Sequence, residues 1–567
     1  MSDKLRIIVI GGVAAGPKTA ARARRMAPEA EITLIDRGTM LSYGSCGLPF
    51  YLDGTVKNLK DLVSTSYGVT RDEEYFLREK GINVLTRTEV QAINRDTKSI
   101  QVRNLDSGDT YTLPYDKLVL ATGATPVIPP FEGLELKGVF RLYHPDDARA
   151  IAEKIDEIEE VVLVGGGFIG MELAGALNNR HLFVSVVEMQ EQTLAGVLDP
   201  DLEAVLRNRL QAKGIEFYLK EKVLRFEGDE RGNLREVITD KRTIETDACI
   251  IATGVRPNVE LARAAGLTIG PTGAIAVNEY LQTSDPDIYA VGDCVENTHL
   301  ISGRKIYLPL ASTANRQGRV AGDNVTGHKS RFKGVLATAV LQVTDWNIGR
   351  TGLGEQEAKD LGYEVVSAIT PAHDRTHFHP EHGLVILKVI MDRRSRKLLG
   401  VQAIGPGEVD KRIDVAATAL NFGATIDDLA DLDLGYAPPY STSIDPLQHT
   451  ANSLRNKLAG LARAITPLEL KAKIDRGDDF LLLDVRTERE FQQKRFRGAK
   501  KVLSVSLDKL REHLFEIPRD QEIVLMCESG VRSYEALRTL EGAGFKNVGY
   551  LEGGFQTWPY GPSGLMS

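Results

Sequence analysis

The chain has 567 residues, of which 42% are hydrophobic and 26% charged, and its formal net charge is -8. This length exceeds what one hydrophobic core supports and predicts several domains. The composition and acidic balance are typical of a globular α/β protein and argue against non-specific nucleic-acid binding. No stretch approaches the roughly 18 uninterrupted apolar residues of a membrane-spanning helix, and the N-terminus lacks a signal-peptide pattern. We therefore expect a cytoplasmic protein with no membrane partner.

The first segment predicts a nucleotide-binding unit. KLRIIVIGGVAAGPKTAARARR has the pattern of a strand, a glycine turn and a helix, and EITLID predicts the next strand. Gly11 and Gly16 would let the backbone approach a pyrophosphate, and Asp36 would bind the ribose hydroxyls. Val13 stands where the middle glycine of the motif is usual.

A second segment repeats this design with a complete motif. EEVVLVGGGFIGMELAGALNNRHLFVSVVEM places glycines at positions 165, 167 and 170 and ends the following strand at Glu188. Two such motifs in one chain indicate two dinucleotide sites. Glu188 is followed by Met189 rather than by an arginine that could pair with a 2′-phosphate, which favours NADH and leaves NADPH possible.

Three later segments extend the pattern: YDKLVLATGATP, DACIIATGVRPN and TSDPDIYAVGDC. Together with the two glycine motifs they resemble the pyridine nucleotide-disulfide oxidoreductase family over residues 1 to about 450. The resemblance implies FAD in the first domain and NADH in the second. The helix begun in LPLASTANRQGR would point its positive N-terminus at the flavin ring. The implied cofactor-binding residues are Gly11, Gly12, Gly16, Asp36, Thr122, Gly123, Gly165, Gly167, Gly170, Glu188, Gly254, Asp293 and Ala311.

The C-terminal residues predict one further domain. FLLLDVRTEREF, VLMCESGVRSYEALRTLEGAGF and VGYLEGGFQTW resemble three landmarks of the rhodanese, or sulfurtransferase, domain. The loop CESGVRS would surround Cys527 with backbone N–H groups, with Arg532 at its far side, which suits an anion or a persulfide. Asp484 and Arg486 are interpreted as structural anchors. Two features depart from the family: QKRFRGAKKV replaces GHIxGA, and Glu528 adds a negative charge beside the thiol.

These resemblances imply an α/β fold with two Rossmann-like domains, an α+β dimerisation domain and a C-terminal α/β rhodanese domain. The strand-rich region around GLVILKVIMD and the helix KRIDVAATAL resemble the family's interface domain, so we expect a homodimer. The predicted boundaries are 1–125 with 250–325 for the FAD-binding domain, 126–249 for the NAD-binding domain, 326–450 for the dimerisation domain, 451–465 for a helical linker and 466–567 for the rhodanese domain.

The four cysteines limit which sulfur or metal chemistry the chain can perform. Cys46, Cys249, Cys294 and Cys527 form no CxxC pair and no metal-like spacing, so we predict neither a disulfide scaffold nor a metal site. Cys249 and Cys294 lie in apolar surroundings and are interpreted as buried structural thiols. Cys46 has no partner nearby in sequence, so a second sulfur would have to come from a substrate. Pro49 predicts a helix start that would favour the Cys46 thiolate.

SYGSCGLPF resembles the signature of the CoA-disulfide reductases, and their fusion to a rhodanese domain matches the whole chain. The resemblance implies that lysine and arginine side chains, most of them on the first helix, pair with the phosphates of coenzyme A. The arginines of ARARR also suit a solvated helix face. The chain departs from that pattern at Ser45, at Ile444 and in THFHP, whose His377 and His379 suit a surface loop or a partner's active site. The implied CoA-binding residues are Lys18, Arg22, Arg25, Ser42, Ser45, Arg78, Tyr436 and Tyr440.

The sequence therefore predicts an FAD-dependent enzyme that uses NADH to reduce a persulfide, polysulfide or CoA disulfide through Cys46, with Cys527 and Arg532 handling sulfane sulfur. One alternative is an NADH oxidase or peroxidase that cycles through a sulfenic acid, although Ala14 stands where such enzymes carry a histidine. Another is a non-redox sulfur-relay protein in which only Cys527 acts.

Overall fold

The computed structural model describes residues 4–496, 498–560 and 565–566. It has the predicted α/β fold class. The chain forms two compact units, the first made of residues 1–165, 179–182 and 223–335 and the second of residues 166–178, 183–222 and 336–567. Arg497, in the predicted QKRFRGAKKV segment, and residues 561–564 and 567 of the predicted rhodanese domain lie outside the described residues.

The first unit is built on a parallel five-stranded sheet whose strands are in the order β18-β7-β1-β2-β3. Its central strands are mostly apolar in their interiors, and Val9 and Leu34 are fully buried. The predicted strand, turn and helix are confirmed, because α1 follows β1 and β2 ends one residue before Asp36. The elements are β1 (Arg6–Ile10), α1 (Ala15–Met26), β2 (Glu31–Ile35), β3 (Asn83–Leu85), β7 (Lys117–Leu120) and β18 (Ile288–Ala290).

Two antiparallel sheets and helix α9 also belong to this unit. Helix α9 begins at Ala311, as predicted, and packs along α1, where Arg22 pairs with Asp323 at 2.5 Å. The sheets are β4 (Thr88–Asn94), β5 (Ser99–Asn104) and β6 (Thr110–Pro114), and β13 (Val223–Gly228), β14 (Leu234–Thr239) and β15 (Thr243–Glu245); α9 is Ala311–Asn324.

The second glycine motif also has its predicted local structure. Strand β10 (Glu160–Val164) pairs in parallel with β16 (Ala248–Ile251), which pairs with β9 (Val139–Arg141). After the glycine turn come α6 (Phe168–Asn179) and β11 (Phe183–Glu188), which pairs in parallel with β12 (Ile215–Leu219). Strand β10 is followed directly by Gly165 and β11 ends at Glu188, so both residues lie at the carboxyl ends of strands, where parallel sheets bind ligands.

The second unit contains an antiparallel sheet in the order β21-β22-β25-β24-β23, with α11 packed on β22 and β25. Helix α11 confirms the helix predicted in KRIDVAATAL. The predicted linker is helical through Leu458, and α13 packs on β23 with Leu447, Ala451 and Leu454 buried. The elements are β21 (Ala339–Val343), β22 (Trp346–Gly352), β23 (Val365–His373), β24 (Leu384–Asp392), β25 (Leu398–Gly405), α11 (Val409–Asn421) and α13 (Pro446–Leu458).

Lys388 is the ion-pair centre of this sheet. Its side chain is 2% exposed, and its Nζ lies 3.0 Å from Asp199, 2.6 Å from Asp201 and 2.9 Å from Glu355. A buried ammonium with several carboxylate partners is stabilised in its charged form, because each pair compensates part of the desolvation cost. Helix α7 (Pro200–Gln211) begins at these aspartates, so Lys388 fixes its N-terminal end against β24.

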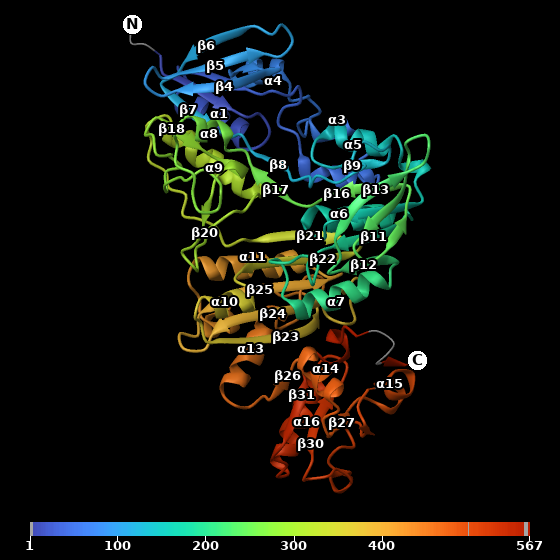
Figure 1. Cartoon of the computed structure of the whole chain (residues 1–567). Helices are drawn as coiled ribbons and strands as arrows, with labels where there is room; N and C mark the ends of the chain where they lie inside the picture. Colours follow the sequence, from blue (N-terminus) through green and yellow to red (C-terminus); the bar gives the residue numbers. More distant parts are fainter. Residues whose placement is uncertain (1–3, 497, 561–564, 567) are drawn as a thin grey trace. The chain divides into compact units, whose positions relative to one another are not determined.

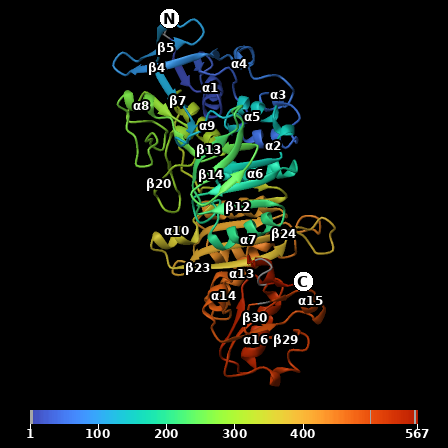
Figure 2. The same cartoon turned by 45° about the vertical axis from the view of Figure 1, so that its right-hand side comes forward.

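The C-terminal domain of the second unit is a parallel sheet in the order β26-β31-β30-β27-β29. Its helices cover a core that includes Leu482, Leu525 and Leu540. In both views the domain lies beside α13 (Figure 1 and Figure 2). The elements are β26 (Ala464–Ile465), α14 (Pro467–Arg476), β27 (Phe480–Asp484), α15 (Glu488–Gln493), β29 (Lys501–Ser504), β30 (Glu522–Met526), α16 (Val531–Gly542) and β31 (Val548–Leu551).

The remaining elements are short. These elements are α2 (Leu48–Leu52), α3 (Leu59–Leu62), α4 (Glu73–Lys80), α5 (Pro145–Ala152), α8 (Glu260–Ala264), α10 (Glu355–Asp360), α12 (Ile426–Ala430), β8 (Ala124–Pro126), β17 (Val255–Pro257), β19 (Asn297–Thr298), β20 (Lys305–Ile306), β28 (Arg495–Phe496) and β32 (Leu565–Met566). Among the described residues, no helix is long and apolar enough to cross a membrane.

A buried carboxylate joins the C-terminal domain to the antiparallel sheet. Glu552, 3% exposed, accepts a hydrogen bond from the Ile369 backbone N–H at 3.0 Å and pairs with Lys457 Nζ at 2.7 Å. Lys457 also donates to the Ser367 carbonyl at 2.6 Å. The carboxylate satisfies an N–H of β23 and the ammonium of α13 together, so the domain is docked by a specific polar contact.

We predict that Glu552→Gln loosens this docking, because it removes the charge opposite the largely buried Lys457 ammonium. The loss should be on the order of 3 kcal/mol, as for other buried pairs that lose one partner. Limited proteolysis of the full chain should cut the 459–465 segment faster in the variant. Asp475→Asn, which breaks the exposed pair between Lys471 and Asp475, serves as the control. Equal cleavage rates in the two variants would contradict this role.

Candidate active site

Cys46 lies at the surface in a short 3-10 helix, Ser45–Gly47, directly before α2. Pro49 is in the first turn of α2, as predicted, but the helix has only five residues, so its dipole at Cys46 is weak. The preceding segment is fixed by Ser42, whose backbone N–H donates to the Gly12 carbonyl at 2.8 Å. Arg71 donates to the Ser42 carbonyl at 2.7 Å, a positioning contact that the sequence did not reveal. The cysteine loop is therefore tied to the first glycine loop.

The first glycine loop has the geometry of a dinucleotide site. A Cβ at Gly11 would overlap the Ala121 carbonyl oxygen, so only glycine fits there. Asp36 accepts hydrogen bonds from the backbone N–H groups of Gly12 and Gly38, both at 2.6 Å. These contacts hold the carboxylate at the carboxyl ends of β1 and β2. Gly16, as predicted, lies in the first turn of α1.

Asp293 and Tyr307 are partly buried residues whose polar groups fit a flavin's polyhydroxyl chain. Burial raises the pKa of Asp293 to about 6. It also raises the pKa of Tyr307, with the Asp293 charge as the second cause. The Tyr307 hydroxyl is buried and has no hydrogen-bond partner in the described part of the chain. Hydroxyl groups of bound FAD would satisfy both side chains, so these residues fit the implied cofactor.

The two ATG segments are joined by Asn258, which the sequence analysis did not single out. Thr122 Oγ1 donates to the Asn258 carbonyl at 2.7 Å, and the Asn258 side chain returns a bond to the Thr122 carbonyl at 2.8 Å. The Asn258 backbone N–H also donates to the Gly123 carbonyl at 3.0 Å. Gly254 accepts from the Val127 N–H at 2.9 Å. These bonds hold the two ATG segments together.

Glu188 repeats the arrangement of Asp36. Its carboxylate accepts from the Gly166 N–H at 2.7 Å and from the Gln190 N–H at 2.8 Å. Met189 is 71% exposed, and no ion pair binds Glu188 among the described residues. A ribose carrying free hydroxyls would meet a carboxylate acceptor here. The predicted glycines have these environments: Gly165 has a positive φ, Gly167 has open space around it, and Gly170 is buried in α6.

The predicted CoA-binding residues have different environments. Lys18, Arg25 and Ser45 are exposed, whereas Arg22 is paired with Asp323 and Arg78 is paired with Glu74 at 2.9 Å. Arg22 thus has a structural partner that the sequence did not show.

Tyr436 and Tyr440, in the second unit, are 51% and 66% exposed and could contact a ligand or a partner. Within its own unit, Lys411 donates to the Tyr440 carbonyl at 3.1 Å.

Cys527 lies in the predicted loop between β30 and α16. It is fully buried, and the Gly530 N–H donates to its Sγ at 3.1 Å. The loop packs against the turn that follows β31, where the Phe555 N–H donates to the Cys527 carbonyl at 3.1 Å. A Cβ at Gly554 would overlap that carbonyl oxygen, so glycine is required beneath the loop.

Arg532 is engaged by Glu490, a partner that the sequence did not reveal. Two hydrogen bonds of 2.7 Å form a bidentate pair, and the Arg532 guanidinium lowers the pKa of Glu490 to about 2. The Ser533 hydroxyl at the end of the loop is buried without a hydrogen-bond partner in the described residues. Arg486 donates twice to Asp484 and is 1% exposed, which supports the predicted structural role of that pair.

The other candidates lie outside these loops. Cys249 and Cys294 are fully buried, and burial raises the pKa of both thiols, as expected of structural cysteines. His377 is in an exposed turn. The described residues contain no cluster of three or more potential metal ligands.

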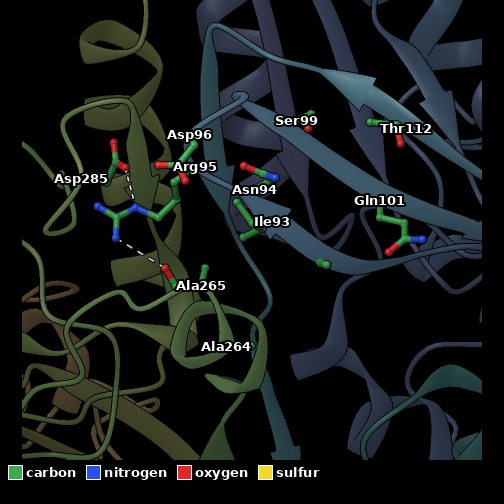
Figure 3. Close-up of a pocket in the computed structure, with 11 residues that line it drawn as sticks. Ile93, Asn94, Arg95, Asp96, Ser99, Gln101, Thr112, Ala264, Ala265 and Asp285 are labelled. Atoms are coloured by element: carbon green, nitrogen blue, oxygen red, sulfur yellow. Dashed lines mark hydrogen bonds and ion pairs between the residues drawn. The ribbon is translucent and has the colours of Figure 1, made fainter.

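A cavity of about 800 Å³ lies on the first unit between the β4-β5-β6 sheet and α8 (Figure 3). Arg95 closes one side by pairing with Asp285 at 2.7 Å and by donating to the Ala265 carbonyl at 3.5 Å. None of the predicted cofactor or sulfur-handling residues lines this cavity.

Family comparison identifies the class of protein. Residues 5–318 match the pyridine nucleotide-disulphide oxidoreductase model, residues 338–447 match the dimerisation domain of that family, and residues 466–559 match the rhodanese-like domain. The chain belongs to the pyridine nucleotide-disulphide oxidoreductase family and carries a C-terminal rhodanese-like domain. Proteins of this family use FAD and NAD(P)H, in agreement with the predicted cofactors.

Three relatives show which members it resembles. A NAD-dependent persulfide reductase from A. fulgidus is 42% identical, with a TM-score of 0.93 over 98% of this chain and 100% of that one. The CoADR-RHD structure from Bacillus anthracis is 34% identical, with a TM-score of 0.91 over 100% and 99%. A CoA-dependent NAD(P)H sulfur oxidoreductase from Pyrococcus abyssi is 38% identical and covers 80% of this chain and 98% of its own length.

We predict that Asp293→Asn changes how the stability of the flavin-free protein depends on pH. The folded pKa of about 6 exceeds the ordinary carboxyl value, so wild-type stability falls as pH rises from about 4 to 6 and stays lower above that. The amide lacks this loss, so it should stabilise the flavin-free protein more at pH 8 than at pH 5, while weakening FAD retention. Urea unfolding at both pH values measures the first effect.

Asp96→Asn, at an exposed position of the same unit, is the matched control and should show neither effect. The interpretation fails if Asp293→Asn retains FAD like wild type and its unfolding free energy follows the wild-type pH dependence.

Proposed function

We propose that this protein uses NADH to reduce the sulfur of a persulfide, polysulfide or CoA disulfide through Cys46, and that Cys527 carries sulfane sulfur. The single observation that supports this best is the exposure of Cys46: its thiol is at the surface and outside any disulfide, whereas Cys249, Cys294 and Cys527 are buried. A reductase of this family with one accessible thiol must take its second sulfur from the substrate. The relatives with persulfide and CoA-dependent sulfur activities support the same substrate class.

The chemistry at Cys46 is thiol exchange followed by reduction. The Cys46 thiolate attacks one sulfur of a CoA disulfide, the S–S bond breaks, and one thiolate leaves. Two electrons from NADH and one proton then cleave the mixed disulfide, which releases the second thiol and restores the Cys46 thiolate. Bound FAD supplies the route for that electron pair. With a persulfide, the same exchange ends in release of thiol and sulfide.

The chain's own residues set up this reaction. Gly12 and Asp36 would hold the nucleotide part of FAD, Asp293 its hydroxyl chain, and Glu188 the ribose of NADH. The Ser42 backbone bond to Gly12 keeps the Cys46 loop against the flavin-binding loop. We infer that Lys18 and Arg25, both exposed and without ion pairs among the described residues, meet the phosphates of coenzyme A. The family's dimerisation domain supports a homodimer.

We predict that Cys46→Ser lowers NADH oxidation with CoA persulfide, CoA disulfide or polysulfide by more than about 100-fold, because no other accessible thiol can form the mixed disulfide. Anaerobic assays with these substrates, and with peroxide as a separate arm, measure this. Cys527→Ser is the reciprocal control and should keep CoA disulfide reduction but lose sulfur transfer from thiosulfate. Full persulfide reduction by Cys46→Ser would overturn the proposal, and turnover with peroxide alone would favour an NADH peroxidase.

A further inference from the structure

A basic side chain from outside the rhodanese domain reaches the Cys527 loop. Arg209 lies in the last turn of α7, whose other end is fixed by Lys388. Its Nη2 donates to the Gln556 carbonyl at 3.5 Å, and the Gln556 side-chain amide donates to Glu528 at 3.0 Å. Glu528 directly follows Cys527, so α7 brings a positive charge to the edge of the loop.

A second cation reaches this edge from the segment that replaces GHIxGA. Lys494 Nζ lies 5.1 Å from the centre of the Phe555 ring, and the Arg486 guanidinium lies 4.0 Å from the same ring. Arg486 also approaches Glu528 at 3.7 Å and donates to the Lys494 carbonyl at 2.5 Å. Lys494, which lies in the QKRFRGAKKV segment that departs from the family, and Glu528, the other departure, therefore belong to one cluster.

The charges of this cluster do not balance. Arg486 is neutralised by Asp484 and Arg532 by Glu490. In the described part of the chain, no carboxylate lies within ion-pair distance of Arg209 or Lys494, and Glu528 is the nearby carboxylate that acts on both. Burial lowers the pKa of both cations, so each is partly removed from water. A positive charge remains in excess, which attracts anions.

Sulfur transfer makes use of such a charge. When an anionic donor such as thiosulfate meets the Cys527 thiolate, the thiolate attacks the outer sulfur, the S–S bond breaks, and sulfite leaves with the bonding electron pair. The thiolate carries one negative charge and thiosulfate carries two, so three negative charges are close together at the loop during this step. The products keep this total, with one charge on the Cys527 persulfide and two on sulfite. Nearby cations lower the barrier, whereas a carboxylate next to the cysteine raises it.

We propose that Arg209 and Lys494 form a specificity site for anionic sulfur donors at Cys527, with Glu528 as a built-in competitor for the same cations. The reductase part of the chain thus supplies one of the charges that select the substrate of the rhodanese domain. This inference rests on the sulfur-carrying role proposed for Cys527. The two cations are specificity-determining residues, and the negative charge of Glu528, which acts on both from beyond ion-pair distance, lowers the affinity for anions.

The test measures sulfur transfer from thiosulfate to cyanide by the full chain in the absence of NADH, which isolates Cys527 from Cys46. Arg209→Gln and Lys494→Gln should each lower kcat/KM for thiosulfate roughly fivefold, and Glu528→Gln should raise it by a similar factor. With a neutral donor, bis(2-hydroxyethyl) trisulfide, all three variants should stay within about twofold of wild type. Arg538→Gln removes one charge from α16 at a pair with Glu541 and is the matched control.

A second measurement applies even if thiosulfate is a poor donor. In a Cys46→Ser background, the rates at which anionic iodoacetate and neutral iodoacetamide alkylate Cys527 are compared by peptide mass spectrometry. The iodoacetate-to-iodoacetamide ratio should fall in Arg209→Gln and Lys494→Gln and rise in Glu528→Gln. Ratios equal to that of Arg538→Gln, or a fall in Glu528→Gln, would overturn the proposal. Persulfide reduction surviving in Cys46→Ser would instead refute the proposed reductase function.

Discussion

The Glu552 carboxylate is the contact on which the arrangement of the second unit depends. It accepts the Ile369 N–H and neutralises Lys457, and these two groups belong to different elements beside the rhodanese domain. Two residues later in the chain, Gly554 supports the Cys527 carbonyl from below. The short turn at residues 552–555 therefore both anchors the domain and packs against the backbone of the Cys527 loop. A displacement of the domain would be transmitted directly to the backbone around Cys527.

Helix α7 is held against the same sheet. Lys388 holds one end of the helix against the antiparallel sheet, and Glu552 holds the rhodanese domain against the same sheet. Because both are fixed to the same sheet, the Arg209 Nη2 lies within reach of the Gln556 carbonyl. Fusion of the domains thus does more than raise the local concentration of one activity near the other. It allows a residue of one domain to shape the chemistry of its neighbour.

The sequence was informative where a motif places backbone groups. Gly11, Gly165 and the CESGVRS loop were predictable because a turn of fixed geometry demands particular residues, and such demands are local. Asp36 and Glu188 followed from their position at strand ends. The partners of charged side chains were not predictable, because pairs such as Arg22 with Asp323 and Arg532 with Glu490 join segments that are distant in sequence and carry no motif. In the sequence, Lys494 is only part of a segment that departs from the rhodanese pattern. Its position beside the Phe555 ring is visible only in the fold.

The two reactive thiols differ in exposure, since Cys46 is open to solvent and Cys527 is fully enclosed. An oxidant arriving from solution therefore meets Cys46 first, and progression to sulfinic acid there is irreversible under most conditions. The chain would then lose its reducing power while its sulfur carrier stays intact. Air exposure would therefore leave a protein that still binds sulfane sulfur at Cys527 but no longer reduces it.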